Sequence, residues 1–119
     1  MTNASGTCPV ETTLGLIGHR WKILIVRDLS AGTRRFGELK RSLAPISQKV
    51  LAAKLREMEA DGLVRREVFP ETPPRVEYTL TPLGESLRPV IQALAAWGES
   101  YAAKRPGPTR MIEGAESDV

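Results

Sequence analysis

The spacing of apolar residues predicts a mainly helical chain with one β-hairpin. Apolar residues three or four positions apart, which place side chains on one face of a helix, recur along most of the chain. Two runs between them suit strands, and the second alternates apolar and polar residues cleanly. The predicted elements, in chain order, are helices over 8–17, 21–29, 34–43 and 47–61, strands over 63–69 and 76–80, and a last helix over 81–104. The second helix is apolar nearly all round, so we expect it in the middle of the fold.

The third and fourth predicted helices are joined by a short break at Pro45. Ser47 is a good N-cap for the fourth helix, and Gly62 is a good stop. Two helices joined by a turn of about three residues make a helix-turn-helix pattern. Because the hairpin follows directly, we predict an α+β, mainly α fold: a winged helix-turn-helix with a two-stranded wing and additional helices at both ends.

The predicted helix after Ser47 has one face suited to a DNA major groove. At about 100° per residue, Lys49, Ala52 and Arg56 fall opposite its apolar face. Small side chains let a helix approach the groove, and long donors reach phosphates or base edges. The residues that we predict to contact DNA are Arg35, Lys40, Ser47, Gln48, Lys49, Ala52, Arg56 and Arg75. Glu57 and its acidic neighbours look merely solvated, so only the first two turns should enter the groove.

The charge distribution is compatible with binding to nucleic acid but does not by itself establish it. The chain has a net charge of +3, yet residues 19–75 hold thirteen Lys or Arg against seven Asp or Glu. The central part therefore nets +6 and the remainder −3. Basic residues near one recognition element can release counterions from a polyanion. The alternative is an ordinary solvated surface with a basic bias.

The last predicted helix carries an apolar stripe longer than a small winged domain needs for its own core. We interpret its C-terminal half, together with the first helix, as a dimer interface. The alternative is that both helices simply close the core of the monomer. The predicted interface residues are Val10, Leu14, Ile17, Leu87, Ile91, Leu94, Trp97 and Tyr101. Pro89 falls inside the stripe and is expected to bend the helix.

Length and composition predict one domain over 8–104, with a flexible N-terminus over 1–7 and a flexible tail over 105–119. Cys8 and His19 are the only cysteine and histidine, so we expect no metal site and no cofactor. No apolar run has the roughly 18 residues of a membrane span, and the first residues do not resemble a secretory signal. We therefore expect a soluble cytoplasmic protein.

Seven short strings carry a resemblance to a known family, in the order and spacing of that family. They are Cys8-Pro9, residues 18–22, 35–39, 46–51 and 55–64, Pro73 to Tyr78, and residues 80–84. Together, from about Cys8 to Tyr101, the chain resembles the HxlR-type (MarR-like) winged helix-turn-helix transcriptional regulators. The resemblance implies a bacterial or archaeal homodimer that binds double-stranded DNA, with the helix from Ser47 in the major groove. On this basis we expect a repressor acting on a palindromic operator.

The resemblance also draws attention to Cys8, because several members sense electrophiles or oxidants through a cysteine at the start of the first helix. An independent physical argument agrees, since free N–H groups at a helix N-terminus stabilise a thiolate. The alternative is a small half-buried side chain with no signalling role. As the only cysteine, it can form a disulfide only with another protomer or a small thiol. His19-Arg20 departs from the small-then-basic pair that is commoner in the family before Trp21.

Two other classes of function fit the sequence less well. An enzyme with Cys8 as nucleophile and His19 as base would lack a third group to orient the imidazole, so we predict no enzymatic activity. A winged-helix module that binds only protein predicts an acidic or apolar surface at Lys49 and Arg56, where the sequence has basic residues.

Overall fold

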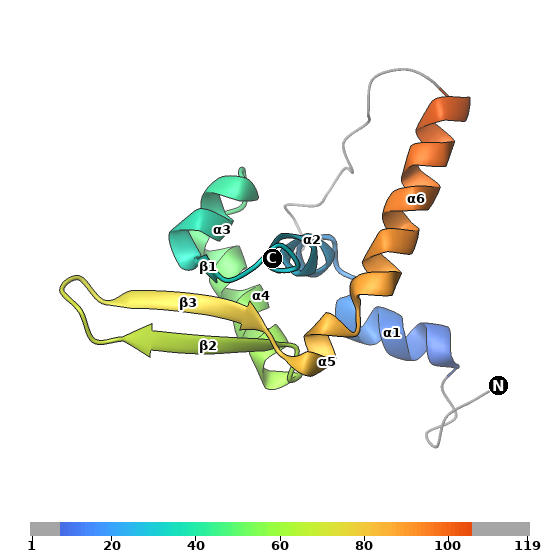
Figure 1. The fold of residues 1–119 in the computed structure, drawn as a ribbon. Helices are drawn as coiled ribbons and strands as arrows, with labels where there is room; N and C mark the ends of the chain where they lie inside the picture. The colour runs from blue at the N-terminus through green and yellow to red at the C-terminus, as the bar shows by residue number, and fades with distance from the viewer. Residues whose placement is uncertain (1–7, 106–119) are drawn as a thin grey trace.

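The computed structural model describes residues 8–105, and apart from Arg105 the two predicted tails lie outside this range. The elements are α1 (Pro9–Ile17), α2 (Arg20–Leu29), β1 (Arg34–Arg35), α3 (Phe36–Ser42), α4 (Gln48–Ala60), β2 (Val64–Phe69), β3 (Arg75–Leu80), α5 (Pro82–Glu85) and α6 (Arg88–Lys104). They are drawn in Figure 1. The winged helix-turn-helix fold predicted from the sequence is confirmed, and most helix and strand ends lie within one or two residues of their predicted positions.

Local capping explains where α4 and α5 begin and end. Ser47 Oγ accepts a hydrogen bond from the backbone N–H of Val50 at 3.0 Å and so starts α4. Gly62 follows α4 with φ +79°, a conformation that favours glycine. Thr81 Oγ1 accepts from the N–H of Gly84 at 3.0 Å and donates to the carbonyl of Gly62 at 2.5 Å. This hydroxyl therefore ties the start of α5 to the end of α4.

The sheet has three antiparallel strands in the order β1-β3-β2, where we predicted two. The prediction was wrong at Arg34 and Arg35, which we placed at the start of a helix. They pair instead with Tyr78 and Glu77 of β3, and α3 begins at Phe36. The unpaired edge of β3 offers backbone hydrogen bonds to any neighbouring extended segment, and a two-residue segment is too short for its sequence pattern to reveal this.

The core forms around α2, as expected for a helix with so little polar surface. Ile25 and Val26 are fully buried at its centre. Around them pack the inward side chains of α3, α4 and the sheet, which are Leu39, Leu43, Ile46, Val50, Leu51, Leu55, Met58, Leu63, Val64, Tyr78 and Leu80. The helix-turn-helix is therefore held on one continuous apolar core.

The C-terminal segment is two helices rather than one bent helix. The structure breaks the helix after Glu85, and Pro89 lies in the first turn of α6. Proline costs no hydrogen bond there, so our expectation of a proline bend inside a continuous helix was wrong. A Cβ atom on Gly84 would lie 2.2 Å from the carbonyl oxygen of Leu63, so only glycine lets α5 pack this closely.

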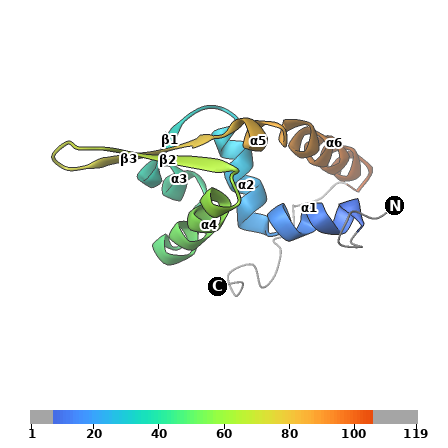
Figure 2. The same cartoon turned by 90° about the horizontal axis from the view of Figure 1, so that it is seen from below.

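The two sides of the molecule carry different elements. In Figures 1 and 2, α3, α4 and the β2–β3 hairpin lie to the left, whereas α1 and α6 lie to the right. The predicted DNA-reading helix and the predicted dimer helices therefore occupy different sides of one domain.

Candidate nucleic-acid interface

The first two turns of α4 present unpaired polar side chains to solvent. Gln48, Lys49 and Arg56 are exposed, and none of them forms an ion pair with another residue of the range 8–105. Ala52 is half-buried at the edge of this surface. Ser47 is exposed, and its hydroxyl accepts the capping hydrogen bond of α4. The structure thus places these five predicted residues along one helical stretch.

An ion pair anchors the other end of α4 to α2. Nζ of the buried Lys22 lies 2.8 Å from Oε1 of Glu57, and Nζ of Lys54 lies 3.7 Å from the same oxygen. The hydrogen bond from Lys22 lowers the pKa of Glu57 below its ordinary value, with help from the charges of Lys22 and Lys54. Our interpretation of Glu57 as merely solvated was therefore wrong. It orients α4 on the core.

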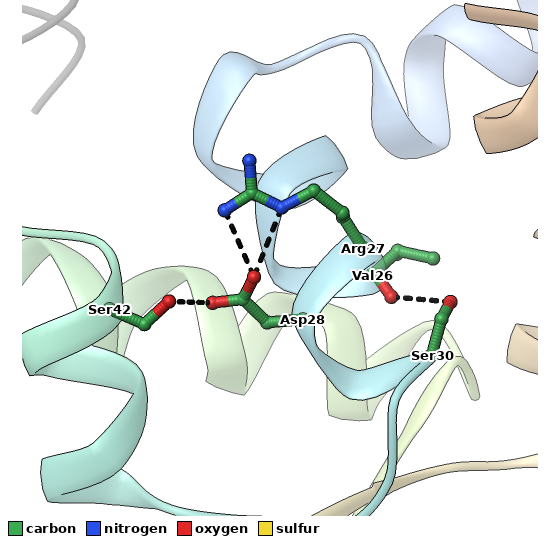
Figure 3. Close-up of polar contacts among 5 residues, drawn as sticks. All are labelled: Val26, Arg27, Asp28, Ser30 and Ser42. Atoms are coloured by element: carbon green, nitrogen blue, oxygen red, sulfur yellow. Dashed lines mark hydrogen bonds and ion pairs between the residues drawn. The ribbon is translucent and has the colours of Figure 1, made fainter. Parts of the chain in front are cut away.

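A second polar contact fixes α3 on α2 (Figure 3). The hydroxyl of Ser42 donates to Asp28 Oδ2 at 2.6 Å, across the two helices. Arg27 holds the other oxygen of this buried carboxylate, with Nε at 3.0 Å and Nη2 at 2.9 Å. Because α2 carries both Lys22 and Asp28, it sets the relative orientation of the two helices of the helix-turn-helix.

The predicted contacts on α3 lie near its two ends. Arg35 precedes the helix, and its backbone N–H donates to Oε1 of Glu38 at 2.8 Å. Lys40 lies in the last turn, where a cation complements the helix dipole. Both side chains are exposed.

The guanidinium of Arg75 is paired within the hairpin, whereas we predicted that it would contact DNA. Its guanidinium lies 2.9 Å from Glu71 Oε2 and 3.2 Å from Glu77 Oε2, and it stacks on the ring of Phe69 at 4.0 Å. Two carboxylates therefore already neutralise this cation. We correct the expectation that Arg75 is available to a phosphate or the minor groove, because a contact would first require breaking these pairs.

Three arginines of the sheet were not among the DNA contacts that we predicted from the sequence. Arg65 and Arg66 of β2 are exposed, and Arg34 of β1 is half-buried. None of them forms an ion pair within the part of the chain that the structure describes. The alternation of β2 could have shown that Arg66 shares a face with Val64, but the pairing of Arg34 required the tertiary structure.

Exposed apolar side chains gather on α1, α5 and α6. Eight of the nine large hydrophobic residues exposed within residues 8–105 lie there, which are Val10, Leu14, Leu16, Leu83, Val90, Leu94, Trp97 and Tyr101. Trp97 is 69% exposed, and its ring stacks on Tyr101 at 5.4 Å between centroids. Exposed apolar side chains concentrated in this way are typical of an interaction site.

Three of the predicted interface residues contribute to the core of the monomer. Ile17 is only 3% exposed and lies in the core, so we withdraw it from the candidate interface. Leu87 and Ile91 are half-buried and pack against the same core. The first turn of α6 thus closes the monomer, as our alternative interpretation held, and the outer part of α6 projects away from it (Figure 1).

Cys8 caps the helix that carries part of this apolar surface. Its Sγ accepts a hydrogen bond from the backbone N–H of Glu11 at 3.4 Å, and the side chain is half-buried. The thiol is free. It therefore lies at the start of α1, two positions before the exposed Val10.

Within residues 8–105, no three His, Cys, Asp or Glu side chains are grouped as they would be around a metal ion. No helix of that range is both long and apolar enough to span a bilayer.

Comparison with known proteins agrees with this architecture. The family described as HxlR-like helix-turn-helix matches residues 16–106. The chain belongs to this family. Its relatives include the uncharacterised HTH-type transcriptional regulator YdeP of Bacillus subtilis, 47% identical over 94 residues, which cover 79% of this chain and 73% of YdeP. The chain is thus a helix-turn-helix transcriptional regulator, as its family and relatives indicate.

Two solved structures that are similar to this chain are of particular interest. The redox regulator HypR in its reduced form is 45% identical, with a TM-score of 0.75, covering 78% of this chain and 92% of HypR. The reduced form of YodB from B. subtilis is 42% identical, with a TM-score of 0.71, covering 86% of this chain and 99% of YodB.

Proposed function

We propose that this protein is a homodimeric, sequence-specific DNA-binding regulator that represses transcription from a palindromic operator. The observation that carries the proposal is the exposed, unpaired set of Gln48, Lys49 and Arg56 on α4, a helix that the Lys22–Glu57 ion pair joins to α2 in the core. In a helix-turn-helix, such side chains reach base edges and phosphates of the major groove. A repressor of this kind would block access of RNA polymerase to the promoter.

A gel-shift with the promoter of its own gene tests DNA binding. We expect a palindrome-dependent shift that weakens by about 10³–10⁵ between about 50 and 200 mM salt, the range for about 6–10 phosphate contacts. A duplex of the same composition with one half-site scrambled is the control. A shift that is indifferent both to salt and to the scrambled half-site would rule out the proposal.

A symmetric dimer explains why we propose a palindrome. The exposed surface of α1 and α6 lies away from α4, so two copies joined there would each keep the DNA-reading helix free (Figures 1 and 2). A two-fold dimer presents its two α4 helices to half-sites related by the same symmetry.

We further propose that Cys8 makes the regulator responsive to oxidants or electrophiles. The thiol is free and caps α1, beside the surface through which we propose dimerisation. The name of the neighbour HypR describes a redox regulator, which supports this role. Two Cys8 thiols would lose two protons and two electrons to diamide, which becomes the hydrazine, and form one S–S bond between protomers. The resulting change at the interface would alter the spacing of the two α4 helices and release the operator.

The Cys8→Ser variant separates sensing from binding. We expect it to bind the promoter as the parent does, because serine is also a good N-cap, and to remain bound when diamide is added. The parent should lose its shift with diamide and regain it with dithiothreitol. Equal release of both proteins by diamide would contradict the sensing role of Cys8.

A further inference from the structure

The face of the three-stranded sheet that packs on the helices carries two arginines and no acidic residue. We call the face with the buried Tyr78 the inner face, because it packs on the helices. Arg34 of β1 and Arg66 of β2 are both register partners of Tyr78, so the three side chains form one row across the inner face. The next row, on the outer face, contains Glu77 between Arg35 of β1 and Glu67 of β2.

The inner row has cations without acidic partners. Arg66 is exposed and Arg34 is half-buried, and neither forms an ion pair with any other described residue. The two arginines stand on the outer strands on either side of β3, about 10 Å apart at their backbones. The helices α3 and α4 lie on one side of the sheet (Figure 2), and the row belongs to the face that packs on the helices, where β1 pairs with β3.

We propose that Arg34 and Arg66 bind the phosphate backbone of the DNA strand that runs between α4 and the hairpin. The proposal rests on the proposed function, and it adds a contact site that the recognition helix does not supply. Guanidinium groups bind phosphate oxygens through two parallel hydrogen bonds, and two such groups in one row fit a line of phosphates.

The outer face is a poor alternative for the same backbone. Its charges are mixed, because Glu67 and Glu77 lie there among arginines, and each carboxylate repels phosphate. The guanidinium of Arg75 on that face is already held by Glu71 and Glu77. Arg65 also lies on the outer face, opposite Thr79, and so provides a matched control with the same charge on the same strand.

The test measures fluorescence anisotropy with two duplexes, one from the promoter of its own gene and one of shuffled sequence, over a range of salt. We expect Arg34→Gln and Arg66→Gln each to weaken binding to both duplexes by on the order of tenfold at about 0.1 M salt, and each to reduce the salt slope by about 1. Arg65→Gln should retain the parental affinity and slope. Circular dichroism verifies that each variant is folded. Arg66→Lys keeps the positive charge and should therefore retain most of the salt dependence of binding.

Different results overturn different claims. If the parent binds and all three glutamine variants match it, or all three weaken equally, the assignment of Arg34 and Arg66 is wrong while the proposed function stands. If the parent itself shows no salt-dependent binding to either duplex, the proposed function fails first. A loss confined to the promoter duplex would also overturn the assignment, since phosphate contacts act on every sequence alike.

Discussion

Replacing Lys49 or Arg56 with alanine is expected to weaken promoter binding by about 1–3 kcal/mol each if the side chain reads a base edge. Both side chains are exposed on α4 and make no ion pair within residues 8–105, so removing them costs the free protein little. The loss would therefore report on the complex with DNA. Anisotropy titrations with the promoter duplex and with a shuffled duplex measure it.

The two duplexes also distinguish the roles of the side chains. A residue that reads a base should lose affinity mainly for the promoter, whereas a phosphate contact should weaken both duplexes and reduce the salt slope by about 1. Lys104→Ala is the matched control, because it removes the same charge from the last turn of α6. Unchanged affinity in both Lys49→Ala and Arg56→Ala would show that α4 does not lie in the groove.

Trp97→Asp is expected to convert the proposed dimer to monomers. Trp97 is 69% exposed in the single chain, so the change leaves the monomer core intact. At a dimer interface it would remove a side chain that buries roughly 150–250 Å² and leave a carboxylate in an apolar contact. Light scattering coupled to size-exclusion chromatography measures the mass. Loss of paired half-site binding should then lower operator affinity by about 10²–10⁴.

A second exposed apolar residue provides the control for this experiment. Val68 is also exposed, but it lies on the hairpin, far along the chain from α1 and α6. Val68→Asp should leave the molecular mass unchanged. If Trp97→Asp keeps the parental mass at every concentration tested, the apolar surface of α6 is not what joins the protomers.

The sequence was most informative where a local signal acts alone. Ser47 caps α4 because its hydroxyl reaches an N–H three residues on, a contact that depends only on neighbouring residues. Gly62 ends α4 for an equally local reason, its positive φ. The placement of Gln48, Lys49 and Arg56 on the exposed side of α4 likewise followed from helical periodicity.

Ion pairs that the sequence patterns did not reveal explain two of the errors. Glu57 and Arg75 were read as solvated or free, yet the first pairs with Lys22 and the second with two glutamates. The Lys22 contact joins residues far apart in the chain, which no spacing rule encodes. The partners of Arg75 are close in sequence: Glu71 lies in the hairpin loop, and Glu77 lies two positions along β3, on the same face of the extended strand.

Apolar periodicity, capping residues and family motifs thus determined by themselves the winged helix-turn-helix and the family, because these depend on contacts between near neighbours and on the face that must be buried. Only the folded chain decided that Arg34 and Arg35 form a third strand, that Ile17 belongs to the core, and which cations are already neutralised. These outcomes depend on which segments the packing of the core brings together. The edge of a strand pairs with the segment that lies beside it, and a charged side chain pairs with the opposite charge within its reach.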